Sequence, residues 1–131
     1  MNIVATIEAR MSSSRLPGKV LLESEGLPLI GHLVNRLKQV KLINNIVLAT
    51  TNNNTDDILE KFAKDYKIDC FRGEELNVMK RVLDAAVKFN ADVIVEITGD
   101  CPLVDAELVD KCISKFNNLN IDYFSNTIPP T

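Results

Sequence analysis

The chain has 131 residues, of which 46% are hydrophobic and 25% charged, and it carries a formal net charge of −3. This length fits one domain, residues 1–131, whose fold buries about two-thirds of the unfolded chain's surface. The composition excludes disordered, collagen-like and low-complexity classes, and the acidic balance argues against nucleic-acid or membrane-surface partners.

Cysteine usage and the amino-terminal segment predict a cytoplasmic protein. Cys70, Cys101 and Cys112 form no CxxC pair and His32 is the single histidine, so reduced thiols fit better than disulfides or a zinc site. The first residues lack the basic segment of a signal peptide, and no apolar run approaches the roughly 18 residues of a membrane span.

Short β-branched runs alternate with stretches of helical periodicity. In chain order we expect a strand at 3–7, a helix at 30–40, a strand at 45–51, a helix at 58–63, a strand at 68–71, a helix at 79–87, a strand at 92–98 and a helix after Asp105. The strands are continuously apolar, which is typical of a parallel sheet buried on both faces. The alternation therefore predicts βαβ crossovers and a doubly wound α/β sandwich.

Three details refine these elements. Asn54 or Thr55 is expected to cap the second helix, with Asp56 near its positive end. The apolar stripe of the third helix comprises Met79, Val82, Leu83, Ala86 and Val87, with Arg81 off it. A fifth strand is expected at 122–126, followed by a proline turn, so that the chain resembles an interrupted domain.

Two segments fall where ligands bind in such sheets, beyond the carboxyl ends of the strands. The loop at 8–19 concentrates Arg10, Arg15 and Lys19 with three serines, a set that suits phosphate contacts. A solvated basic loop explains the same composition. The loop is no P-loop, since Ser13 stands at the first glycine position and Val20 follows Lys19, and no GxGxxG occurs.

The second segment is the predicted strand end at 98–102. Asp100 follows a glycine there, and a carboxylate in such a place can hold Mg²⁺ together with phosphate oxygens. By spacing alone, an ordinary aspartate turn before a helix is the commoner explanation.

The basic loop and four other stretches resemble a known family. SRLPGK at 14–19 and GLPLI at 26–30 resemble signature segments of the cytidylyltransferases that make CMP-activated acidic sugars. ATT at 49–51, FRG at 71–73 and ITGDCPLVD at 97–105 look like the spore coat polysaccharide biosynthesis protein F subfamily. The resemblance runs over essentially the whole chain.

The resemblance implies a three-layer α/β/α sandwich with a mostly parallel sheet, of the Rossmann-like kind found in sugar nucleotidyltransferases. It implies transfer of CMP from CTP to an acidic sugar with release of pyrophosphate, in polysaccharide biosynthesis, with Mg²⁺ as cofactor. The implied nucleotide-binding residues are Ala9, Arg10, Ser13, Arg15, Lys19 and Arg81. Asp100 is the implied metal ligand, and it would share the catalytic role with Arg10 and Lys19.

Two departures from the family pattern leave alternatives open. Asn77 stands where the subfamily usually has aspartate, and relatives continue beyond residue 131, so the resemblance covers their amino-terminal part. A sugar nucleotidyltransferase using another base, or a non-catalytic nucleotide-binding fragment, fits the same residues. A homodimer or a complementing second chain is the expected protein partner.

Overall fold

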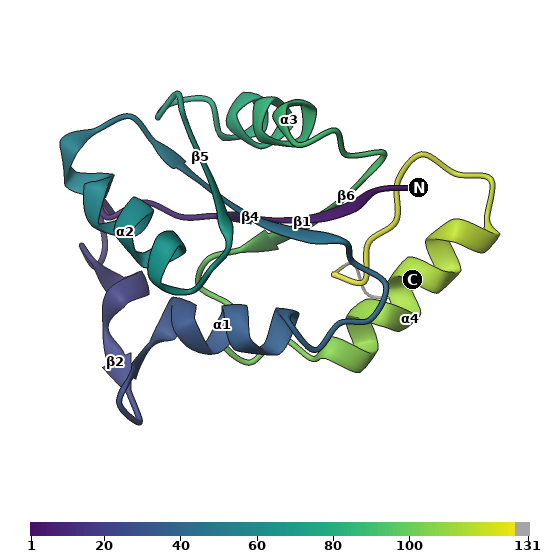
Figure 1. The fold of residues 1–131 in the computed structure, drawn as a ribbon, viewed down its shortest axis with the longest axis horizontal. Helices are drawn as coiled ribbons and strands as arrows, with labels where there is room; N and C mark the ends of the chain where they lie inside the picture. The colour runs from purple at the N-terminus through teal and green to yellow at the C-terminus, as the bar shows by residue number, and fades with distance from the viewer. Residues whose placement is uncertain (128–131) are drawn as a thin grey trace.

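The computed structural model describes residues 1–127, which form a four-stranded parallel sheet with helices on both faces (Figure 1). The elements are β1 (Ile3–Glu8), η1 (Lys19–Leu21), β2 (Glu23–Ser24), β3 (Leu27–Pro28), α1 (Leu29–Leu37), β4 (Asn45–Thr51), η2 (Asn54–Asp56), α2 (Asp57–Asp65), β5 (Asp69–Gly73), α3 (Val78–Lys88), β6 (Val93–Thr98) and α4 (Ala106–Asn118). The strand order is β5-β4-β1-β6, and β2 and β3 form a separate antiparallel hairpin. Within residues 1–127, no helix is both long and apolar enough to cross a membrane.

The predicted sandwich is confirmed, with a core on each side of the sheet. Ile3, Ala5 and Ile7 of β1 point to the larger core, where α1, α2 and α4 supply the other apolar side chains. Val4 points to a smaller core beneath α3. Because neighbouring residues of a strand face opposite ways, β1 is buried on both faces from Ile3 to Ile7, and Thr6 is the one polar residue of that stretch.

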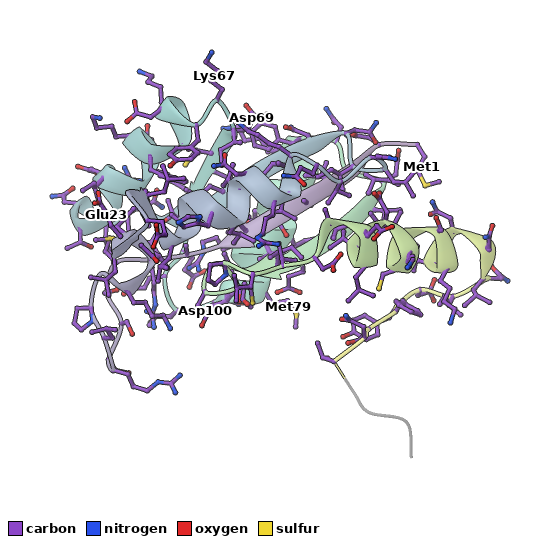
Figure 2. The ribbon with its side chains drawn as sticks, turned by 90° about the horizontal axis from the view of Figure 1, so that it is seen from below. Met1, Glu23, Lys67, Asp69, Met79 and Asp100 are labelled. Atoms are coloured by element: carbon purple, nitrogen blue, oxygen red, sulfur yellow. The ribbon has the colours of Figure 1, made fainter. Side chains whose placement is uncertain are left out.

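The third helix, α3, buries only part of its predicted apolar stripe, since Val82 and Ala86 are 6 and 3% exposed. Met79, Leu83 and Val87 are 83, 54 and 68% exposed, and Arg81, expected off the stripe, is only 2% exposed. Figure 2 shows Met79 on the outside of the molecule. The helix lies over β1, β4 and β5, so only one of its two apolar flanks meets the sheet.

β6 lies at the edge of the sheet and is covered on one face. Its apolar sequence predicts burial on both faces, but Ile94, Glu96 and Thr98 are exposed. This expectation is wrong because α3 covers the neighbouring strands on that side. The fifth strand expected at 122–126 is also wrong, since residues 121–127 form no strand. The proline turn expected after it lies outside the described residues.

The starts of two helices differ in how they are capped. Asp105 caps α4 as expected, because its carboxylate accepts the Leu108 N–H at 3.0 Å. Asn54 and Thr55 do not cap α2; they belong to η2, and Asp56 takes the cap position without a capping side-chain bond. The Asp56 carboxylate instead binds groups of β4 and of the basic loop.

Candidate nucleotide-binding site

The carboxyl ends of β1 and β6 meet closely at one edge of the sheet. Glu8 pairs with Thr98, and the N–H of Gly99 donates to the Glu8 carbonyl oxygen at 2.9 Å. A Cβ at Gly99 would lie 2.7 Å from that oxygen, so only glycine permits this approach. The approach brings Asp100 to the tip of β1, on the side of the molecule away from Met1 (Figure 2).

Residues 11–18 form a closed loop that follows β1. The N–H of Gly18 donates to the Met11 carbonyl oxygen at 2.8 Å, and Gly18 has a φ of 72°, a left-handed conformation that favours glycine. The N–H of Met11 donates to Oδ1 of Asp56 at 2.7 Å. Both backbone polar groups of Met11 are therefore engaged, which fixes the base of the loop.

A pocket of about 280 Å³ lies between this loop and the strand ends. All the residues that the sequence predicts for the site line it: Ala9, Arg10, Ser13, Arg15, Lys19, Arg81 and Asp100. A larger hollow of about 1220 Å³, between α4, the end of α1 and residues 119–126, contains none of them. The smaller pocket is the candidate site because several charged and polar groups converge on it.

Lys19 and Asp100 form an ion pair at the pocket. Lys19 Nζ lies 3.2 Å from Asp100 Oδ2, and this ammonium, followed by Thr98, holds the pKa of Asp100 below its ordinary value. The carboxylate is half exposed and therefore ionised and accessible at neutral pH. Mg²⁺ takes one or two carboxylates and completes its shell with phosphate oxygens and water, so Asp100 fits a metal as a single-carboxylate ligand.

Arg10 is held by Glu75, which follows β5. Glu75 Oε1 accepts from Arg10 Nη1 at 3.3 Å and from Ser12 Oγ at 3.2 Å, while Oε2 accepts from Asn53 Nδ2 at 2.7 Å. The bonds from Asn53 and Ser12, and then the Arg10 charge, hold the pKa of Glu75 below its ordinary value. Arg10 and Lys19 are thus both paired with acids.

Arg81 and Glu8 both line the pocket, and each of them has a buried polar atom. Arg81 Nη1 donates to the carbonyl oxygens of Glu74 and Glu75 at 3.0 and 3.3 Å. Burial lowers the pKa of Arg81, and burial followed by the nearby Glu96 raises the pKa of Glu8. Arg81 Nε and Glu8 Oε2 are buried and have no hydrogen-bond partner within residues 1–127. Buried polar atoms are nearly always paired, so these two atoms set Arg81 and Glu8 apart among the residues that line the pocket.

Sequence reasoning gave no role in this region to Glu8, Asp56 and Glu75, although Glu8 begins the loop at 8–19. Each lies at or shortly after the carboxyl end of a strand: β1, β4 and β5 respectively. Since parallel strands end at the same edge of a sheet, this position is a signal that could have identified them. Their contacts with the basic loop depend on the path of the connecting segments, which the residue pattern does not specify.

Comparisons with known proteins agree with this architecture. The family described as cytidylyltransferase matches residues 4–131. Spore coat polysaccharide biosynthesis protein SpsF of Bacillus subtilis is 38% identical over 126 residues, which are 93% of this chain and 52% of that protein. A cytidylyltransferase structure from Leptospira borgpetersenii has a TM-score of 0.87 and 40% identity, covering 92% of this chain and 51% of its own. The structure of CMP:2-keto-3-deoxy-manno-octonic acid synthetase complexed with CTP has a TM-score of 0.76 and 27% identity, covering 90% and 48%.

The match covers nearly all of this chain but not all of its relatives. The chain spans about half the length of the proteins it matches. The shared part takes in residues 4–131 of the family match, and its fold is the Rossmann-like sandwich of nucleotidyltransferases. The chain belongs to the cytidylyltransferase family.

Proposed function

We propose that the pocket binds CTP and that the chain supplies the nucleotide-binding part of an enzyme that transfers CMP to an acidic sugar. The observation that carries the proposal is the convergence of four cationic side chains and one exposed carboxylate on one pocket: Arg10, Arg15, Lys19, Arg81 and Asp100. The CTP bound in one structural relative supports the nucleotide, and the acid for which that synthetase is named supports the class of sugar.

The triphosphate would meet the three cations of the basic loop. Arg15 is exposed and makes no ion pair with residues 1–127, so it can reach a phosphate without losing a partner. Arg10 and Lys19 would exchange their carboxylate partners for phosphate oxygens. Guanidinium groups suit such contacts because two parallel N–H donors match two phosphate oxygens.

The remaining residues would hold the base and the cation. Ala9 and Arg10, with Ser13, are proposed to contact the cytosine nucleotide, and Arg81, which also lines the pocket, is proposed to reach it from α3. Asp100 would hold Mg²⁺ when Lys19 turns to phosphate. A bound Mg²⁺ would supply charge neutralisation and polarisation at the phosphate oxygens.

In the proposed transfer, a sugar hydroxyl oxygen attacks the α-phosphorus of CTP. The new O–P bond forms as the bond to the bridging oxygen breaks, pyrophosphate leaves, and the hydroxyl proton is released. The chain contributes orientation of the triphosphate by the loop and neutralisation of the leaving pyrophosphate by Arg10, Arg15 and Lys19. This mechanism requires no covalent intermediate on the protein.

Two assays test the proposal. Calorimetric titration with CTP, UTP, ATP and GTP is expected to show a preference for CTP, and incubation with CTP, Mg²⁺ and a panel of acidic sugars is expected to release pyrophosphate. Tighter binding of another nucleotide would show that the pocket recognises a base other than cytosine. Binding without pyrophosphate release would favour a nucleotide-binding module that needs a partner, and a folded chain that binds none of the four nucleotides would refute the proposal.

A further inference from the structure

Asp56 is the one acid among the described residues that is fully buried, with 0% exposure. It lies at the junction of η2 and α2, and it does not line the pocket. The transfer reaction proposed above assigns it no part. A buried carboxylate is costly unless its oxygens are bonded, so its partners show what it does for the fold.

Both carboxylate oxygens of Asp56 are used, and they join two separate elements. Oδ1 accepts the Met11 N–H at 2.7 Å, and Oδ2 is hydrogen bonded by the hydroxyl of Thr51 at the end of β4. Thr51 is itself fully buried, and its Oγ1 accepts the Asn53 N–H at 3.2 Å. The carboxylate is therefore fixed to the sheet through Oδ2, and its other oxygen, Oδ1, binds the basic loop.

Met11 is the residue at which the basic loop begins and closes. Its carbonyl oxygen accepts the Gly18 N–H, so one residue carries the bond to Asp56 and the bond that closes residues 11–18. The loop's side chains are mostly exposed, and an exposed loop without such an anchor would sample many conformations. Ordering it on binding would then reduce affinity.

We infer that Asp56 is a positioning residue, which holds the loop at 11–18 in its nucleotide-binding conformation through the backbone of Met11. The identity of the ligand as a nucleotide rests on the proposed function, whereas the anchoring of the loop does not. The competing explanation is that Asp56 only stabilises the start of α2.

Four variants separate these two roles. Asp56→Ala removes both acceptor oxygens. Asp56→Asn keeps an oxygen that can accept from the Met11 N–H, and its amide NH₂ can donate a hydrogen bond to the Thr51 hydroxyl oxygen. Thr51→Val removes the hydroxyl that orients Asp56 and keeps the core volume. Asp110→Ala is the matched control, because Asp110 also holds backbone N–H groups, those of Lys41 and Leu42 at 2.9 to 3.1 Å. Those groups precede β4, at the opposite edge of the sheet.

Two readouts are taken on each folded variant: hydrogen exchange at the Met11 amide, by mass spectrometry, and the affinity for CTP with Mg²⁺, by calorimetry. Asp56→Ala is expected to raise the exchange rate about tenfold or more and to weaken CTP binding by a similar factor. Asp56→Asn should stay within about threefold of the parent in both. Thr51→Val should shift both in the direction of Asp56→Ala, and Asp110→Ala should shift neither, although it lowers stability.

Three results would overturn the inference. The first is an unchanged hydrogen-exchange rate at the Met11 amide in Asp56→Ala. If Asp56→Ala does not fold, the same result in Thr51→Val counts instead. The second is faster exchange with unchanged CTP affinity. The third is an equal loss of affinity in Asp110→Ala, which would reflect stability alone. If the parent binds no CTP, the proposed function fails, and the exchange data still decide whether Asp56 anchors the loop.

Discussion

Arg15 and Lys19 line the same pocket in different electrostatic situations: Arg15 is exposed, while Lys19 is paired with Asp100. Replacing either with Ala is expected to weaken CTP binding by about 1.5–3 kcal/mol, because a charge-assisted bond to phosphate is lost. Binding of cytidine, which has no phosphate, should change much less. Calorimetric titration with both ligands measures the difference.

The matched control for this pair is Lys61→Ala, which removes an exposed lysine of α2 that pairs with Asp65. It changes the net charge by the same amount but lies outside the pocket. If the Arg15 and Lys19 variants bind CTP as tightly as the Lys61 variant does, the phosphate assignment is wrong.

The stability of the fold is expected to depend on pH through Glu8. Burial, followed by Glu96, raises the pKa of Glu8 in the folded protein above its ordinary value of 4.5. The folded state therefore favours the protonated carboxyl more than the unfolded state does. Stability from this group is complete below the ordinary pKa and is lost as pH rises through the raised pKa. Glu8→Gln is thus expected to raise the melting temperature at neutral pH, with little effect below pH 4.5.

Melting curves from pH 4 to 8 check this expectation, with Glu23→Gln as the control because Glu23 is an exposed acid on β2. A Glu8→Gln curve that runs parallel to the parent over this whole range would show that Glu8 is not the source of the pH dependence.

Among the elements, α3 gives the clearest test of the packing. Val82 is 6% exposed, whereas Met79 is 83% exposed, although the residue pattern places both on one stripe. Val82→Ala is expected to lower the free energy of unfolding by about 1.5–2.5 kcal/mol, since two buried methyl groups are lost and a cavity remains. Met79→Ala should change it by less than about 0.5 kcal/mol. Urea unfolding of both variants measures the two values, and equal losses would contradict the orientation of α3.

The elements also show how far the sequence could predict the structure. The strand expected at 45–51 forms over the same residues, because β-branched residues that are buried on both faces leave a continuous signal. The apolar stripe of α3 predicts too much burial, because that helix has two apolar flanks and only one of them lies over β1, β4 and β5. At the site, the basic loop and Asp100 stand out by composition. Asp56 does not, because its role depends on a contact with a distant backbone N–H.

The solvent-accessible surface of the whole molecule is 8252 Å². A compact monomer of its mass, 14.6 kDa, is expected to have about 6,900 Å². Exposed apolar side chains contribute to the difference, among them Ile94 on the edge strand β6 and Leu83 and Val87 on α3. Large apolar side chains gathered at a sheet edge are typical of surfaces that another polypeptide covers. The homodimer or complementing chain expected from the sequence stays a prediction.

The central claim is that this chain binds CTP at the carboxyl edge of its sheet, with Asp100 as the metal ligand. The most direct test is calorimetric titration of CTP with and without Mg²⁺, on the parent and on Asp100→Asn. The melting temperature should move little, because the ion pair of Asp100 with Lys19 is largely exposed and such pairs contribute about 0–1 kcal/mol. The parent is expected to bind CTP more tightly with Mg²⁺, and Asp100→Asn is expected to lose most of this enhancement. A folded parent that does not bind CTP, or equal enhancement in both proteins, would contradict it.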